Sequence, residues 1–235
     1  MGAVLMVAGG TANSSAASFE ELPANTVAVV SHLPVSVGRI TKAEFQRALA
    51  QGAAMDSRGP TPKPGDEGYE ALKDAALEER LDSVWIQGQA AEMGISVTPR
   101  QVATELAQIK QQNFKNEAAY RKYLREAHFT QGDVNERVEL QLLSTQIQEK
   151  ILRSAKGKSQ AGTRKAFQEF IDAYGERWRA RTICAPDYLL DRCSNGPEPS
   201  AQRLLALGAP RGEPADFAEL DLMRPFLGRE VSRMR

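Results

Sequence analysis

Hydrophobic residues recur at helical spacing along most of this chain. Between about Tyr69 and Met93 they fall three or four positions apart and form one wide apolar stripe. The stripe consists of Leu72, Ala76, Leu77, Leu81, Val84, Trp85 and Ala91. Gly94 follows directly and is suited to end a helix in the left-handed conformation. The pattern therefore predicts a long helix that ends at Gly94.

The same spacing predicts four further helices. Thr98, Pro99 and Gln101 provide an N-cap, a proline in the first turn and a capping-box partner for a helix whose apolar face includes Val102 and Leu106. A short helix is expected after residue 116 and a long one after residue 130. A closing helix is expected over about residues 163–180, with its apolar positions at Phe167, Phe170, Ile171, Tyr174 and Trp178.

The N-terminal part has a different pattern. Val27–Val30 and Val35–Val37 are short β-prone runs on either side of His32, and they predict a small hairpin or one broken strand. Thr41 and Glu44 then form a capping box for a helix over about residues 42–51. Glycines and prolines over residues 52–68 predict a loop. The fold class expected is mainly α, with a short N-terminal β element.

Composition narrows the class of protein. The 235 residues are 42% apolar, which is enough for a core in one large domain or two small ones. Thirty basic residues balance thirty acidic ones, so no global field is expected to hold nucleic acid or an anionic membrane. After the N-terminal segment no apolar run reaches the length of a membrane span.

The two ends of the chain predict different roles. Met1–Ser18 is small and largely apolar and contains Ser15-Ala16-Ala17, which is close to a signal-peptidase pattern. No Lys or Arg precedes Arg39, so this is either a truncated export signal or only a tail of small residues. We interpret residues 1–24 as the truncated signal. Prolines and glycines interrupt residues 198–235, which predicts a weakly ordered tail.

The two cysteines, Cys184 and Cys193, form either a disulfide or two free thiols. Their spacing lacks the CxxC form of zinc and redox sites. A disulfide closing so short a loop contributes about 2–3 kcal/mol. The redox conditions of the compartment in which the protein resides decide between the disulfide and the free thiols. The interpretation of residues 1–24 as an export signal favours a disulfide and an extracytoplasmic location, either secreted or in the cell envelope.

Four stretches, taken in order, resemble one family. They are Val27–Val30 with Ile40–Phe45, Trp85–Thr98, Ala118–Ile151 and Phe167–Pro197. Together they are similar to the SurA N-terminal module of SurA- and PrsA-type extracytoplasmic peptidyl-prolyl isomerases, and the last to the cysteine-containing tail of actinobacterial-type members. The resemblance implies a helical chaperone module over residues 25–197, with a closing helix at about 163–180 and a cysteine loop at 184–193.

One departure from this family bears on function. In its catalytic members a parvulin isomerase domain lies between the N-terminal helices and the closing helix. Here only the ten residues Arg153–Gly162 separate the two predicted helices, which is too few for a compact domain. A parvulin site also needs paired histidines beside a sheet, whereas His32 and His128 fall on different elements. We therefore predict that the isomerase domain is absent.

No catalytic residue, metal ligand or cofactor site is predicted. His32 fits a solvated turn, and His128 fits a helix C-terminus, where a cation is favoured. Neither is paired with a nucleophile. Four acidic residues are expected on a solvated helix face that they share with Lys73 and Arg80. They are Glu78, Glu79, Asp82 and Glu92.

Five apolar side chains are the candidates for client binding: Trp85, Met93, Tyr120, Tyr123 and Phe129. They are either core residues or part of a concave surface for unfolded chains. The resemblance implies an ATP-independent extracytoplasmic chaperone that binds unfolded or newly exported polypeptides in a helical groove. The alternatives are a peptidyl-prolyl isomerase, as family membership would suggest, and a docking module for one folded partner. The sequence does not predict the oligomeric state.

Overall fold

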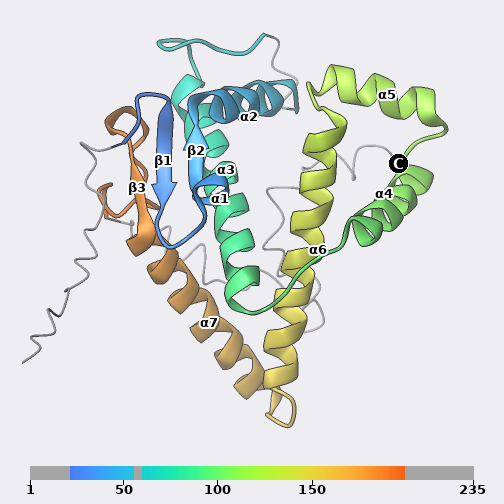
Figure 1. Ribbon diagram of the computed structural model, residues 1–235, viewed down its shortest axis with the longest axis vertical. Helices are drawn as coiled ribbons and strands as arrows, with labels where there is room; N and C mark the ends of the chain where they lie inside the picture. The colour runs from blue at the N-terminus through green and yellow to red at the C-terminus, as the bar shows by residue number, and fades with distance from the viewer. Residues whose placement is uncertain (1–21, 56–59, 199–235) are drawn as a thin grey trace, which may run out of the picture.

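The computed structural model describes residues 22–55 and 60–198. A small antiparallel sheet has β1 (Thr26–Val30) at its centre, with β2 (Arg39–Thr41) and β3 (Thr182–Cys184) on either side. β3 lies about 150 residues beyond β1 in the chain, so the sheet joins the two ends of the described chain (Figure 1). The remaining structure is mainly helical.

Seven α-helices form in the described residues. α3 and α6 run side by side, α7 leans from the sheet toward the end of α6, and α4 and α5 lie on the side of α6 away from α3 (Figure 1). The helices are α1 (Val35–Gly38), α2 (Lys42–Met55), α3 (Tyr69–Glu92), α4 (Pro99–Asn113), α5 (Glu117–Glu126), α6 (Gln131–Ser154) and α7 (Gln160–Arg181). A 3-10 turn spans Pro186–Tyr188.

The predicted end of α3 and the predicted start of α4 are confirmed. Gly94 has a φ of 64°, and the Ile95 N–H donates to the Ala90 carbonyl oxygen at 2.8 Å, which satisfies a carbonyl at the end of α3. Thr98 and Gln101 form both hydrogen bonds of a capping box at the start of α4. Local chemistry therefore determines where these helices begin and end.

Two expectations for the N-terminal region are wrong. Val35–Val37 is part of the helical turn α1, because the Pro34 carbonyl accepts hydrogen bonds from the Val37 and Gly38 N–H groups, each at 2.8 Å. The strand that pairs with β1 begins at Arg39 instead. The following helix also extends beyond residue 51, to Met55, and buries residues of its last turns.

The strand β3 was not predicted, and it changes the picture of the cysteine loop. Cys184 pairs with Ala28 of β1 and forms a disulfide with Cys193, and both sulfurs are buried. The Asn195 side chain donates to the Cys184 carbonyl at 2.8 Å and accepts from its N–H at 3.1 Å. The outer edge of β3 is thus covered by the chain's own residues.

The main core lies between the sheet, α2, α3 and α7. Trp178 of α7 is fully buried and its Nε1 donates to Gln89 Oε1 at 3.2 Å. Trp85 Nε1 donates to Thr182 Oγ1 at 3.0 Å. Gly88 leaves room for the Trp178 ring, since a Cβ there would lie 2.8 Å from Cζ3 and 3.0 Å from Cζ2. The close contact between Trp178 of α7 and Gly88 of α3 holds the closing helix against α3.

A second core forms where α3, α6 and α7 converge. Its buried members are Ile86, Ala90, Leu140, Leu143, Ile147, Ile151 and Phe167. Residues 155–159 alone join α6 to α7, so the two helices form a hairpin with no inserted domain.

The predicted signal segment and tail fall almost wholly outside the described residues. Of residues 1–24 and 198–235, the structure describes only 22–24 and 198. Both remain sequence predictions.

Candidate client-binding groove

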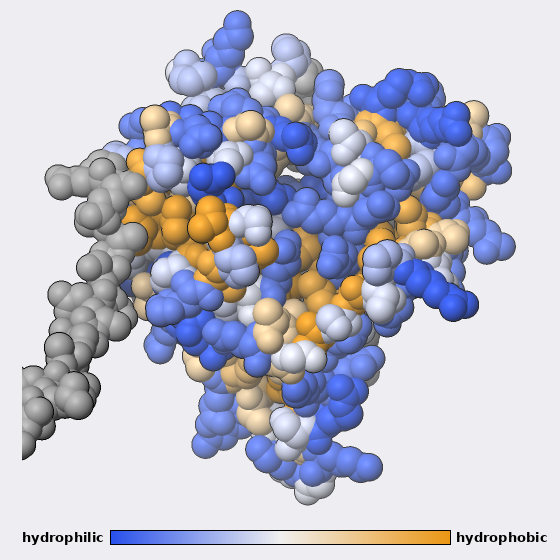
Figure 2. All heavy atoms as spheres, viewed as in Figure 1, coloured by the Kyte–Doolittle hydropathy of each residue, from blue (hydrophilic) through white to orange (hydrophobic). Residues whose placement is uncertain are grey.

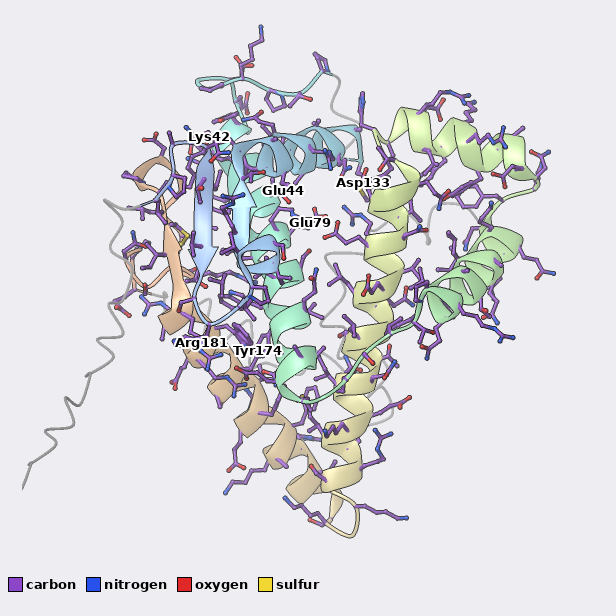
Figure 3. All side chains as sticks on the ribbon, viewed as in Figure 1. Lys42, Glu44, Glu79, Asp133, Tyr174 and Arg181 are labelled. Atoms are coloured by element: carbon purple, nitrogen blue, oxygen red, sulfur yellow. A yellow bond between two sulfur atoms is a disulfide. The ribbon has the colours of Figure 1, made fainter. Side chains whose placement is uncertain are left out.

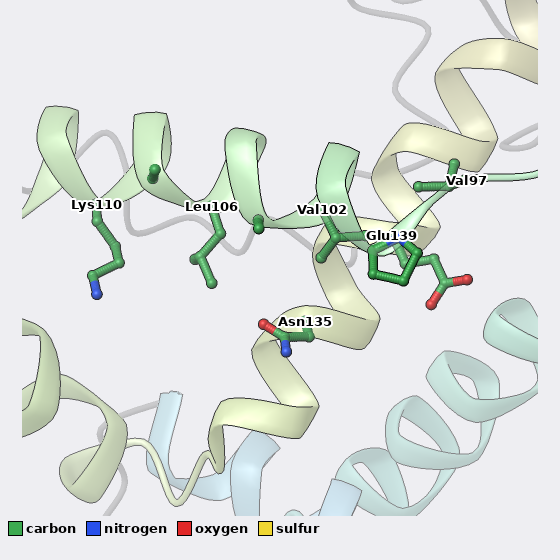
Figure 4. Close-up of a pocket in the computed structure, with 9 residues that line it drawn as sticks. Val97, Val102, Leu106, Lys110, Asn135 and Glu139 are labelled. Atoms are coloured by element: carbon green, nitrogen blue, oxygen red, sulfur yellow. The ribbon is translucent and has the colours of Figure 1, made fainter.

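An open groove of about 520 Å³ runs between α4 and α6 (Figure 4). Most of its lining comes from α4 and from Val97 shortly before it, and two polar side chains of α6 lie opposite. The lining residues are Val97, Pro99, Val102, Ala103, Leu106, Ala107, Lys110, Asn135 and Glu139.

The apolar wall of the groove follows from the spacing of residues on α4. Val102 and Leu106 are one turn apart, and both pack against Val138 of α6 with 8% of their surface exposed. Ala103 and Ala107 are one position further on and stay exposed. Because their side chains are small, space remains beside α6. Figure 2 shows hydrophobic atoms gathered where α4 and the connection before it meet α6.

Polar groups border this apolar wall. Asn135 and Glu139 are exposed one turn apart on α6. Lys110, at the far end of the stripe, forms an ion pair with Glu117, and its Nζ lies 4.4 Å from the centre of the Tyr120 ring. The groove therefore combines an apolar wall with a rim that can hydrogen-bond to a polypeptide backbone.

An aromatic cluster holds α5 at the end of the groove near Lys110. Phe114 lies 5.3 Å from Tyr120 and 5.4 Å from Tyr123, and Tyr123 lies 6.2 Å from Phe129, measured between ring centres. The Tyr120 hydroxyl donates to Gln131 Oε1 at 3.0 Å. Burial raises the pKa of Tyr120. Three of the five side chains proposed for client binding thus form one cluster.

The other two candidates lie elsewhere. Trp85 belongs to the main core and is 4% exposed. Met93 is half-buried at the end of α3, and its carbonyl accepts a hydrogen bond from Lys150 Nζ at 2.6 Å. Within the cluster, Tyr120 and Phe129 are buried, whereas Tyr123 keeps part of its surface exposed.

A charged layer joins α3 to the first turns of α6. Glu79 pairs with Arg137, and in Figure 3 its side chain points from α3 toward α6. Asp133, at the start of α6, lies 3.6 Å from an Arg47 nitrogen of α2. Burial raises the pKa of Glu79, while the Arg137 guanidinium opposes that change.

The expected solvated acidic face is therefore wrong in part. The Glu79 and Asp82 side chains are 19% and 15% exposed, and Asp82 pairs with Arg192 of the cysteine loop. Their arginine partners come from α6 and from the chain after β3. Sequence spacing along α3 alone could not reveal partners so distant in the chain.

The two histidines lie in separate turns. His32 and His128 are exposed and have positive φ angles of 65° and 56°. His128 follows α5, where the Phe129 N–H donates to the Leu124 carbonyl at 2.8 Å in a helix-ending turn. Across residues 22–55 and 60–198, no group of three or more His, Cys, Asp or Glu side chains could hold a metal ion.

The sequence predicted the apolar face of α4 but did not assign it to a groove, and none of the five side chains proposed for client binding lines the groove. It placed Val102 and Leu106 on the apolar face of α4. The exposed small pair Ala103 and Ala107 was a usable signal, because small residues four apart leave space for an approaching chain. Asn135 and the residues near it on α6 carried no such signal, since their place opposite α4 depends on how the helices cross.

These features define a helical module with an open groove between α4 and α6. The chain belongs to the family of SurA-like N-terminal domains, whose family model matches residues 4–148. No parvulin domain is found in the chain. No curated protein and no solved structure matches it.

Family membership indicates a chaperone-like function with polypeptide substrates. The disulfide and the family are consistent with an extracytoplasmic location. Among the helices described, none has the length and apolar character needed to cross a membrane.

Proposed function

We propose that this protein is an ATP-independent extracytoplasmic chaperone that binds unfolded or newly exported polypeptides in the groove between α4 and α6. The open groove, with its apolar wall and exposed alanines, carries this proposal. A concave apolar surface with few directional polar groups can hold chain segments of many sequences.

The dimensions of the groove suit a short segment. The lining stripe of α4 runs from Pro99 to Lys110, which is about 16 Å at the rise of an α-helix. An extended chain covers that length with roughly five residues at a rise of about 3.3 Å each. So small a contact favours weak and reversible binding, as holding an unfolded client requires.

The five side chains proposed from the sequence take two roles in this proposal. Met93 and Tyr123 keep exposed surface and are proposed to contact clients beyond the groove. Trp85, Tyr120 and Phe129 are buried, and we propose that they hold the helices in the arrangement that forms the binding surface.

A pair of charge-matched variants tests the site. Ala103→Glu with Ala107→Glu places two carboxylates in the groove, whereas Thr104→Glu with Gln108→Glu adds the same charge to exposed positions of α4 outside the groove lining. Light scattering of several unrelated aggregating clients is the measurement. The groove variant should lose protection and the control should keep it; equal protection by both would refute the groove as the binding site.

The two alternative functions, a peptidyl-prolyl isomerase and a docking module, predict different results. An isomerase would accelerate cis–trans conversion of a proline peptide, and Ala103→Glu with Ala107→Glu would be expected to change that rate only if the groove were its active site. A docking module for one folded partner would bind it saturably and would not protect unrelated clients from aggregation. Protection without any rate effect is the outcome that the proposal requires.

A further inference from the structure

Although the charges of the whole chain balance, one end of the molecule is strongly basic. No Asp or Glu occurs from Lys150 to Gln168, a stretch that forms the last turn of α6, the connecting turn and the first turns of α7. Six basic residues lie in it: Lys150, Arg153, Lys156, Lys158, Arg164 and Lys165. Lys150 through Lys165 is called the basic tip below.

Three of these six basic side chains have a partner within the protein. Lys150 Nζ donates to the Met93 carbonyl, Arg153 lies 3.3 Å from Glu149, and Lys165 lies 3.7 Å from Glu169. Counting both glutamates against the six basic residues leaves a net charge of +4 over residues 149–169.

The remaining three charges face solvent. Lys156, Lys158 and Arg164 are exposed, and within the described chain none of them forms an ion pair. Long exposed basic side chains with no intramolecular partner are available to an anionic surface.

The shape of the basic tip indicates what it can bind. α6 and α7 converge there, and the turn joining them is the extreme end of the described chain in the view of Figure 1. Leu152 lies among the basic residues and is 42% exposed. A convex tip cannot enclose a small ligand, but it can meet a flat surface with several charges at once, and an exposed leucine can enter the apolar boundary of a lipid layer.

We propose that the basic tip docks the protein on the surface of an anionic phospholipid bilayer. Lys156, Lys158 and Arg164 would contact lipid phosphates, and Leu152 would enter the interface between headgroups and acyl chains. The exposed leucine favours a lipid surface over a soluble polyanion such as nucleic acid, which offers no apolar layer. The inference is independent of the proposed function, because the basic tip lies at the opposite end of α6 from Asn135 and the groove.

Vesicle binding by the full chain tests this inference. The probe is a vesicle of equimolar phosphatidylcholine and phosphatidylglycerol, with pure phosphatidylcholine as the neutral reference. Each basic residue near such a surface strengthens partition roughly fivefold, so Lys156→Glu, Lys158→Glu and Arg164→Glu together should weaken it by more than about a hundredfold. The control Arg100→Glu, Lys115→Glu and Arg125→Glu makes the same charge change on α4, α5 and their connection.

We expect the control variant to bind anionic vesicles and the variant of the basic tip to lose that binding. Circular dichroism of both variants establishes that they are folded. Equal binding by the two variants, or no preference of the unaltered chain for anionic vesicles, would overturn the inference.

A second measurement separates a bilayer from a soluble polyanion. Leu152→Ser should weaken vesicle partition and leave binding to heparin unchanged. If Leu152→Ser has no effect on vesicle partition and heparin binds the basic tip as well as vesicles do, the surface is a general polyanion site and the lipid proposal fails.

Discussion

The crossing of α3 and α7 depends on the absence of a side chain at Gly88. A Cβ built there would lie 2.8 and 3.0 Å from two carbons of the Trp178 ring and closer still to Cη2, whereas non-bonded carbons prefer about 3.5–4.0 Å. The substitution Gly88→Ala therefore forces the ring or one helix to move by about 1 Å.

The ring has little freedom to move. Trp178 is fully buried, and its Nε1 donates a hydrogen bond to Gln89 Oε1. Its backbone carbonyl accepts a hydrogen bond from Thr182 Oγ1 at 2.8 Å. Overpacking a core costs about 1–3 kcal/mol, and so close an overlap belongs at the upper end. Alanine gains about 1 kcal/mol over glycine inside a helix. We expect Gly88→Ala to lower the free energy of unfolding by about 2 kcal/mol.

Urea unfolding monitored by circular dichroism measures this change. Gly175→Ala on α7 is the control, because its added Cβ meets nothing within 4 Å, and it should stabilise the protein by up to about 1 kcal/mol. Combining Gly88→Ala with Trp178→Phe should reduce the penalty of the alanine, since the smaller ring leaves room. If Gly88→Ala were as stable as Gly175→Ala, the tight crossing would be refuted.

Three further predictions concern the disulfide, a capping charge and the start of α4. Replacing Cys184 and Cys193 by serine should lower the free energy of unfolding by about 2–3 kcal/mol, and thermal unfolding that matches the oxidised protein would contradict the disulfide's role. Burial alone would raise the pKa of Glu44, but hydrogen bonds from Thr41 and the charges of Arg80 and Arg47 together outweigh it and hold that pKa below its ordinary value of 4.5. Its charge therefore stabilises the fold above pH 4.5 and ceases to do so as the pH falls through the folded-state pKa. The stability difference between the protein and Glu44→Gln should disappear on acidification, and a difference that stays constant in acid unfolding would contradict this. Thr98→Ala should cost about 1 kcal/mol and weaken protection of clients by fraying the start of the groove; unchanged protection would show that this turn is not part of the site.

Much of the helical structure was predictable because its signals are local. The Thr98 capping box and the turn at Gly94 each involve residues within five positions of one another. Hydrogen bonds over such short separations form with little loop-closure entropy, so they act in the same way in many tertiary settings. The family resemblance rests on the order of these elements, and the family match supports it.

The error at Val35–Val37 was local, because that segment forms a helical turn with hydrogen bonds to the Pro34 carbonyl. The other errors arose where a distant part of the chain decided the outcome. β3 is a strand because it pairs with β1, and nothing in the three residues themselves requires that. Glu79 and Asp82 are withdrawn from solvent because Arg137 and Arg192 reach them from other elements. The desolvation of a carboxylate is offset by a partner's charge, and the identity of that partner is a property of the packed fold.

The sequence by itself determined six of the seven described helices, the end of α3 at Gly94, the start of α4 at Thr98, the direct link between α6 and α7, and the apolar stripe of α4 that includes Val102 and Leu106. Only the tertiary structure decided that Asn135 faces this stripe across an open groove, and that Lys156 and Arg164 project from one end. Helical periodicity determines which residues share a face of one helix. Which faces meet, and which remain exposed, depends on how the helices cross and pack.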